Sequence, residues 1–296
     1  MKNENPYDCI VTGGGPGGLQ AALHLARFNR RVLVLDKGGG RTRHASHIEN
    51  YLGRELVTGR ELIEGGFDQV RNFGVEIARL RVSKVLKKEL FEVRTPEKNF
   101  FSKFVIASTG ATENLPRIAN LHRFFAKSYF TCVDCDGYRT KGKKLVILGL
   151  SINAVRLAFA VKQMFTKDIT LILDNFIPPD DFVEMLGEDG IVLKYGKAVE
   201  LEGEDQLTGM QLDTGEFVPC EVILASFGYI LNDDYLNDLA LDRDSIRKIT
   251  VSSKGESSCP GLYAVGAIRT GSSQAIIAAG RGAVAAIDIN QKILEL

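Results

Sequence analysis

The chain has 296 residues, of which 45% are hydrophobic and 25% are charged. This length corresponds to about two domains, and these proportions are those of a globular protein, so a disordered chain and a small scaffold held together by disulfides or metal are both excluded. The 37 Lys and Arg residues balance the 37 Asp and Glu residues, so no overall field attracts the chain to nucleic acid or to acidic membranes.

Neither a secretory leader nor a membrane span is expected from the sequence. No leader of basic, apolar and small residues precedes Tyr7, and no uninterrupted apolar stretch reaches the roughly 18 residues that a span needs. Five cysteines occur, but only Cys132 and Cys135 are close in sequence, which is unlike a secreted disulfide framework. We therefore expect a cytoplasmic protein with one local redox pair and with neither a nucleic-acid nor a membrane partner.

The first elements predicted along the chain form a βαβ unit. Residues 7–12 are β-branched and apolar, residues 13–18 are turn-forming, an apolar stripe over residues 19–26 has helical spacing, and residues 32–35 return to strand. Such a unit places the turn between the first strand and the helix, where a ligand can meet the helix N-terminus.

Glycines occupy this turn with a spacing that is typical of dinucleotide sites. Gly13, Gly15 and Gly18 form the pattern Gly-x-Gly-x-x-Gly, which permits a tight turn, close approach to a pyrophosphate, and helix packing. Asp36 ends the second strand, where a carboxylate can bind both hydroxyls of an adenosine ribose. We expect a dinucleotide here; the alternative is a plain glycine-rich turn followed by a solvated aspartate.

The same design recurs later in the chain. Residues 74–103 indicate short strands, residues 104–107 a further strand, and the chain turns polar near residue 113. A second strand, helix and strand follow within residues 145–173, and a glycine-rich stretch over residues 261–282 gains helical character after Gln274.

The recurrence predicts an α/β fold with two Rossmann-like three-layer domains of the dinucleotide-binding type, the second inserted into the first. We expect the first domain to comprise residues 1–113 and 245–296, and the inserted domain to comprise residues 114–244.

Cys132 and Cys135 form the sequence Cys-Val-Asp-Cys, which Asp136 and Gly137 follow. This spacing allows a small disulfide ring that thiolate exchange opens reversibly, and the Asp136 carboxyl could deliver or remove the proton that exchange requires. Three alternatives stay open: half of a zinc site, for which no second Cys-x-x-Cys and no close Cys/His pair occurs; two structural thiols; and an Asp136 that serves only as a turn residue. No metal site is expected.

At this point the chain resembles the low-molecular-weight thioredoxin reductase family over nearly its whole length. Four segments carry the resemblance. Residues 13–18 are similar to the family's FAD-binding turn, and residues 132–137 to its Cys-Ala-Thr-Cys-Asp-Gly loop. Residues 48–53 are similar to its Glu-Asn-aromatic-Pro-Gly segment, with Leu52 in place of proline, and residues 273–275 with Gly280 to its closing flavin segment.

The resemblance implies FAD in the first domain, a disulfide and normally NADPH in the inserted domain, and a homodimer. It implies that Cys135 faces the flavin, that Cys132 attacks a partner disulfide, and that Asp136 acts as acid or base. The FAD-binding residues that it implies are Gly13, Gly15, Pro16, Gly18, Asp36, Lys37, Arg41, His47, Asn50, Thr109, Gly110, Gly266, Ala267, Gln274 and Ala275.

Several residues depart from the family pattern. Ser151 stands at the middle glycine of the second βαβ turn, and Asp174 and Asn175 stand where the family carries arginines for the 2′-phosphate of NADPH. The chain is thus similar to the ferredoxin-dependent flavin thioredoxin reductases and the diflavin-linked disulfide oxidoreductases, which lack this nucleotide site. Ala267 replaces an aspartate that holds the flavin ribityl chain, so either FAD is retained by the other contacts or the site is altered and accompanied by a second FAD.

We therefore expect an FAD-dependent disulfide oxidoreductase that works without NAD(P)H. Its partner would be a thioredoxin-like protein or a small disulfide or dithiol, with ferredoxin as a candidate electron donor. The alternatives are an NAD(P)H-dependent thioredoxin reductase, a small-molecule dithiol oxidase that uses oxygen, and a flavin-binding redox sensor without turnover.

Overall fold

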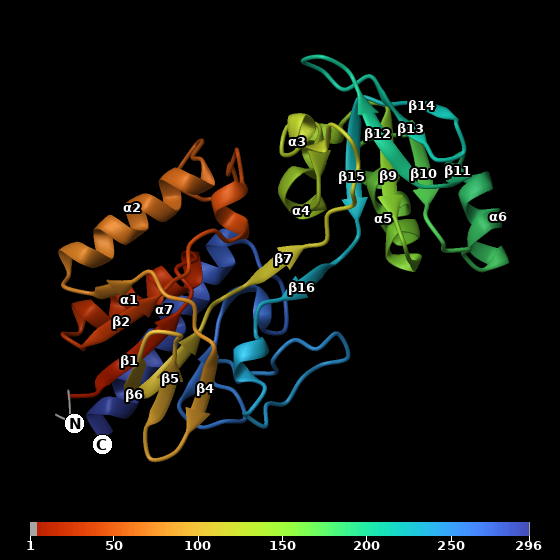
Figure 1. The fold of residues 1–296 in the computed structure, drawn as a ribbon. Helices are drawn as coiled ribbons and strands as arrows, with labels where there is room; N and C mark the ends of the chain where they lie inside the picture. The colour runs from red at the N-terminus through yellow and green to blue at the C-terminus, as the bar shows by residue number, and fades with distance from the viewer. Residues whose placement is uncertain (1–4, 296) are drawn as a thin grey trace. The chain divides into compact units, whose positions relative to one another are not determined.

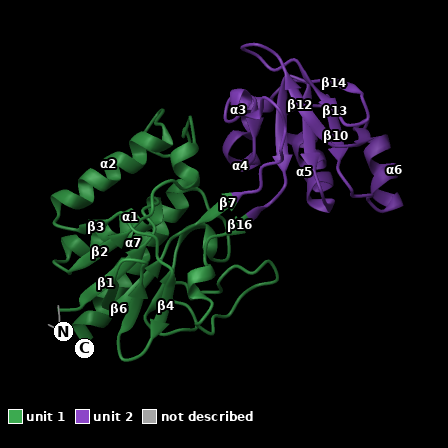
Figure 2. Cartoon of the chain, in the orientation of Figure 1, with its two compact units in different colours: residues 1–112, 230–296 green, residues 113–229 purple. Residues whose placement is uncertain are grey.

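The structure is a computed structural model that describes residues 5–295, and it divides into two compact units. Unit 1 comprises Met1–Thr112 and Ile230–Leu296, and unit 2 comprises Glu113–Tyr229 (Figure 2). The chain leaves unit 1 through strand β7 (Ala111–Glu113) and returns through strand β16 (Tyr229–Leu231), and these two strands pair with each other. Unit 2 is therefore inserted into unit 1, as the recurrence in the sequence predicts.

Unit 1 is built on a mainly parallel sheet. Strand β1 (Tyr7–Thr12) lies between β2 (Val32–Leu35) and β6 (Asn99–Ala107) and pairs with both in parallel. Strand β17 (Leu262–Ala264) pairs with the end of β6, and β3 (Glu76–Ala78) extends the sheet beyond β2. Strands β4 (Lys84–Lys87) and β5 (Phe91–Arg94) add an antiparallel extension.

Both faces of this sheet are buried, which explains why its strands are almost continuously apolar. On one face, Val11 packs with residues of helices α1 (Pro16–Arg27), α2 (Gly59–Asn72) and α7 (Ala275–Glu295). On the other face, Ile10 packs with Tyr235 and Leu236 of the returning chain. The remaining short helical turns of unit 1 are η1 (Arg41–His44), η3 (Asp234–Leu236) and η4 (Gly266–Ile268).

Unit 2 repeats this architecture on a smaller scale. Its parallel sheet has the order β11 (Val192–Tyr195), β10 (Ile169–Leu173), β9 (Leu145–Gly149), β15 (Val222–Ser226) and β8 (Tyr129–Phe130). An antiparallel sheet of β12 (Ala198–Glu202), β13 (Gly209–Leu212) and β14 (Phe217–Pro219) is also present (Figure 1). The helices are α3 (Leu121–Phe124), α4 (Val133–Asp136), η2 (Gly137–Thr140), α5 (Ile152–Met164) and α6 (Asp180–Glu188).

The predicted α/β fold with two Rossmann-like units is confirmed, but the structure places the return to unit 1 at residues 229 and 230, before the predicted residue 245. Residues 232–247 form a second polar stretch, which led to the later predicted boundary although it contains two core residues. Tyr235 and Leu236 are 4% and 0% exposed and belong to the core of unit 1, so the chain has already returned there. Within residues 5–295, no helix is both long and apolar enough to cross a membrane.

The junction of α1 and α7 depends on two glycines. A Cβ atom at Gly282 would lie 2.1 Å from the backbone oxygen of Gly17, and one at Gly17 would lie 3.0 Å from the backbone oxygen of Ala278. The two helix backbones thus touch directly. Because Gly17 is the second residue of α1, directly after the glycine turn, this contact fixes the start of α1 against the C-terminal helix.

The Gly282→Ala substitution is expected to lower the free energy of unfolding by about 1–3 kcal/mol, since its methyl group must displace backbone. Gly280→Ala is the matched control on the same helix, because nothing lies within 4 Å of a Cβ atom there; it should be neutral or stabilising by up to about 1 kcal/mol. Denaturant titration of both variants measures the difference. Equal stabilities would show that the α1 and α7 contact is not close-packed.

Candidate functional site

A cavity of about 390 Å³ lies in unit 1 beside the turn between β1 and α1. Its lining includes many of the residues that the resemblance implies, namely Gly13, Gly15, Pro16, Asp36, Lys37, Arg41, Thr109, Gly110, Gly266, Ala267, Gln274 and Ala275. In the part of the chain that the structure describes, the predicted residues Gly18, His47 and Asn50 lie outside this lining. Segments far apart in sequence therefore meet around one cavity.

The glycine turn has the geometry that its spacing predicts. Gly13 has φ +100°, and a Cβ atom there would lie 2.6 Å from the backbone oxygen of Ser108. Gly18 faces the turn itself, since its Cβ atom would lie 2.2 Å from the backbone oxygen of Gly13; it serves packing, which explains its place outside the lining. Gly15 is the N-cap of α1 and supplies no side-chain hydrogen bond, so the helix N-terminus is open to an anion.

Asp36 is held at the cavity by backbone donors. Its Oδ2 accepts a hydrogen bond from the Gly14 amide at 3.0 Å, and its Oδ1 accepts one from the Gly38 amide at 2.6 Å. The side chain is only 9% exposed, and the Arg79 guanidinium lies 3.8 Å away. A carboxylate has about four acceptor positions, so acceptor capacity remains for ligand hydroxyls.

Three residues of this cavity were missed by the sequence analysis. Tyr235 Oη lies 2.7 Å from Thr12 Oγ1 and 3.3 Å from Thr109 Oγ1, and burial raises the pKa of Tyr235 to about 12. Asn232 accepts a hydrogen bond from Thr109 Oγ1 at 2.5 Å through its backbone oxygen. Asn232 and Tyr235 lie in the stretch assigned to the inserted domain, so no local signal pointed to them, and Arg81 lies in a segment interpreted as short strands.

The cavity carries several cations. Lys37, Arg41, Arg43 and Arg81 all line it. Two of them are paired at the surface, Arg43 with Glu64 at 2.6 Å and Arg81 with Asp234 at 3.7 Å. Together with the open N-terminus of α1, these charges favour a ligand that carries phosphate.

The second candidate centre lies in unit 2, where Cys132 and Cys135 form a disulfide with a Cα–Cα distance of 5.3 Å. Both cysteines and Asp136 are half-buried. The Arg139 guanidinium Nε lies 3.5 Å from Asp136 Oδ1, which holds a positive charge beside that carboxylate. No further zinc ligands lie beside these cysteines, since residues 5–295 contain no group of three or more His, Cys, Asp or Glu side chains that could hold a metal ion.

The loop after the disulfide is shaped by Gly137. A Cβ atom there would lie 2.7 Å from the ring of Phe165, the C-cap residue directly after α5, and 2.9 Å from Val133. Thr140 Oγ1 donates to the backbone oxygen of Gly137 at 2.7 Å. The cysteine loop is therefore packed firmly against the core of unit 2, and only a residue without a side chain fits after Asp136.

The turn between β9 and α5 differs from its counterpart in unit 1. Ser151 is the N-cap of α5, and its Oγ accepts a hydrogen bond from the Asn153 amide at 3.4 Å. Asp174 follows the next strand, and the Asn175 side chain donates to it at 2.7 Å. The cavity at this turn, which Gly149 and Asp174 line, measures about 10 Å³, enough for about one water molecule.

Comparison with known proteins agrees with this geometry. A family model described as pyridine nucleotide-disulphide oxidoreductase matches residues 7–283. The thioredoxin reductase of Helicobacter pylori (strain J99) is 30% identical to this chain over 95% of the chain and 97% of its own length. The crystal structure of the thioredoxin reductase from Streptococcus pyogenes MGAS5005 superimposes with a TM-score of 0.90 and 25% identity, covering 98% of this chain and 99% of that one.

Other relatives are longer. The NADH dehydrogenase of Ferdinandcohnia aciditolerans is 29% identical over 97% of this chain but over 57% of its own length, and that of Bacillus subtilis (strain 168) is matched over 58% of its length. The chain thus spans a little over half of these relatives. The predicted resemblance to thioredoxin reductases is confirmed at the level of the family.

The residues around the unit 1 cavity fit FAD. The open N-terminus of α1 suits the pyrophosphate, the buried Asp36 carboxylate suits the adenosine ribose, and the segment at Gln274 closes the cavity. Ala267 lines the wall with a methyl group, where the resemblance to the family implies an aspartate, but the residues that suit the phosphate and the ribose line the cavity.

We expect Asp36→Asn to weaken FAD binding by about tenfold, because hydrogen bonds to a charged group contribute about 1.5–3 kcal/mol. Titration of the apoprotein with FAD, followed by quenching of flavin fluorescence, gives the dissociation constant. Asp68→Asn is the control, since this exposed aspartate lies on α2 and pairs with Arg71 at 2.7 Å. An unchanged FAD affinity in Asp36→Asn would show that this carboxylate does not bind the ribose.

Proposed function

This chain belongs to the pyridine nucleotide-disulphide oxidoreductase family, and from that premise we propose that it is an FAD-dependent thiol-disulfide oxidoreductase of the thioredoxin reductase type. The observation that carries the proposal is the disulfide between Cys132 and Cys135, with Asp136 directly after it. The same chain contains a cavity whose residues fit FAD. A reversible disulfide and a flavin together form a two-electron relay.

In this proposal the residues of unit 1 hold and orient the cofactor. The turn from Gly13 to Pro16 and the α1 N-terminus bind the pyrophosphate, Asp36 binds the ribose, and Lys37 and Arg41 add positive charge. Bound FAD supplies the two-electron chemistry that side chains lack. We also propose that the chain works as a homodimer, as its resemblance to the family implies.

The residues of unit 2 carry out the exchange with the partner. The Cys132 thiolate attacks one sulfur of the partner disulfide, which forms a mixed disulfide and releases one partner thiolate. The Cys135 thiolate then attacks Cys132 Sγ, which restores the Cys132–Cys135 disulfide and releases the second thiolate. Asp136, beside the Arg139 guanidinium, accepts the protons that the two thiols release and donates them to the two thiolates of the partner. One disulfide is reduced and one is formed, so the electrons balance.

The decisive test replaces one sulfur. Cys135→Ser should slow flavin reduction by dithiothreitol by more than about 100-fold, because the removal of a reacting nucleophile acts on that scale. Anaerobic loss of the flavin absorbance gives the rate. Cys259→Ser is the matched control, since this partly buried thiol of unit 1 is outside the disulfide. If Cys135→Ser keeps the normal rate, the relay between flavin and disulfide is wrong.

We further propose that the reductant of the flavin is not a nicotinamide nucleotide but an electron-carrier protein such as ferredoxin. Two features of unit 2 support this. Ser151 Oγ accepts a hydrogen bond from the Asn153 amide at the N-terminus of α5, where a pyrophosphate would bind. Asp174 and Asn175 stand where a 2′-phosphate would need cations.

Anaerobic titration tests this second proposal directly. NADPH and NADH should leave the flavin oxidised over minutes, whereas dithiothreitol bleaches it in the same sample. The relatives named NADH dehydrogenase favour the opposite result. Rapid bleaching by either nucleotide would therefore replace this proposal with an NAD(P)H-dependent reductase and leave the disulfide relay intact.

A further inference from the structure

The parallel strands of unit 2 end at a common edge of their sheet. Gly149 of β9 pairs with Leu173 of β10 and with Ser226 of β15, and Leu173 pairs with Tyr195 of β11. These four residues are the last of their strands, and Figure 1 shows β9, β10 and β15 running in the same direction. We call this side of unit 2 the carboxyl edge.

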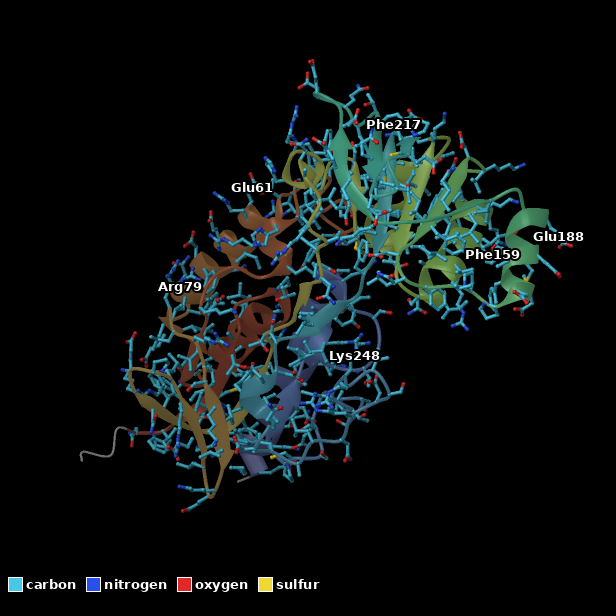
Figure 3. The ribbon with its side chains drawn as sticks, turned by 45° about the vertical axis from the view of Figure 1, so that its right-hand side comes forward. Glu61, Arg79, Phe159, Glu188, Phe217 and Lys248 are labelled. Carbon is cyan, nitrogen blue, oxygen red and sulfur yellow. A yellow bond between two sulfur atoms is a disulfide. The ribbon has the colours of Figure 1, made fainter. Side chains whose placement is uncertain are left out.

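Large apolar side chains are exposed along the carboxyl edge. Ile177, four residues beyond the end of β10, is 80% exposed, Tyr195 is 48% exposed, and Leu150, directly after β9, is 44% exposed. Figure 3 shows the side chains of unit 2 as sticks around these strands. Burial of large apolar side chains is favourable, so three of them at one edge form a surface that gains free energy from a partner.

The reactive disulfide belongs to the same edge. Strand β8 pairs in parallel with β15 and ends at Phe130, two residues before Cys132. Because neighbouring strands lie about 4.8 Å apart, the four spacings from β8 to β11 extend over about 19 Å. This length exceeds that of a small dithiol and matches the contact surface of a protein. The partner that reaches the disulfide also meets the apolar side chains.

The charges beside Ile177 indicate the character of that partner. Residues 174–184 contain four carboxylates, those of Asp174, Asp180, Asp181 and Glu184, and neither Lys nor Arg. Asp180 and Asp181 are exposed at the start of α6. Resting on the proposed function, we propose that the carboxyl edge is the docking surface for the protein disulfide, whose contact surface is apolar at its centre and bordered by Lys or Arg.

The test compares a protein disulfide with a small one on the full chain. The protein is reduced with dithiothreitol, desalted without oxygen, and mixed with each oxidised thioredoxin of the same genome, or with 5,5′-dithiobis(2-nitrobenzoate). Ile177→Asp should lower the second-order rate with the thioredoxin substrate about tenfold, while the rate with the small disulfide stays within about twofold. Asp180→Lys should lower the thioredoxin rate alone, because it reverses one charge of the rim.

Met164→Asp is the matched control. This residue ends α5, beside the starting ends of the strands, and is 53% exposed, so both rates should stay at the level of the unchanged chain. Equal thioredoxin rates for Ile177→Asp and Met164→Asp would overturn the docking surface and leave the proposed function standing. Loss of NADPH or FAD binding in Ile177→Asp would also overturn the docking surface, because it would indicate a nucleotide site instead. Failure of the unchanged chain to reduce the small disulfide would instead contradict the proposed function.

Discussion

The two units of this molecule differ in whether the N-terminus of their first helix after the glycine turn is open to an anion. Both α1 and α5 follow a parallel strand and a glycine turn, so each offers free backbone amides and a positive dipole end. At α1 the N-cap is Gly15, and the amides face a cavity of about 390 Å³. At α5 the N-cap is Ser151, whose own hydroxyl accepts a hydrogen bond from the Asn153 amide at 3.4 Å. A side-chain oxygen thus satisfies a donor at α5, whereas Gly15 supplies none at α1.

The cofactor cavity also depends on the chain returning from unit 2. Thr12, the last residue of β1, and Thr109, two residues beyond β6, form hydrogen bonds with Tyr235 and Asn232 of the returning segment. Without that segment the hydroxyl of Thr109 would lose both partners at a partly buried site, which costs about 1–3 kcal/mol for each unsatisfied group. The segment that returns from the inserted unit therefore supports the cavity of unit 1 through these hydrogen bonds.

The sequence predicted those features that local chemistry determines. Alternation and helical spacing gave the two Rossmann-like units, and the glycine spacing placed Gly13 and Gly15 at a cavity. What it could not predict depends on contacts between distant segments. Tyr235 looked like part of a polar linker because only the folded chain shows its ring in the core, and the same error moved the domain boundary to residue 245. His47 was assigned by analogy alone, and it lies outside the cavity lining.

In doubly wound sheets the ligand site lies beyond the carboxyl ends of the strands, because helix N-termini and loops converge there. Unit 1 follows this rule for its cofactor. Unit 2 keeps the architecture, but Ser151, Asp174 and Ile177 turn its edge from a polar anion site into an apolar surface with a negative border. Few side chains suffice for this change, since the backbone that supports them is the same. A docked protein and a nucleotide would compete for this edge, so the proposed docking surface and the proposed reductant of the flavin stand on the same three side chains.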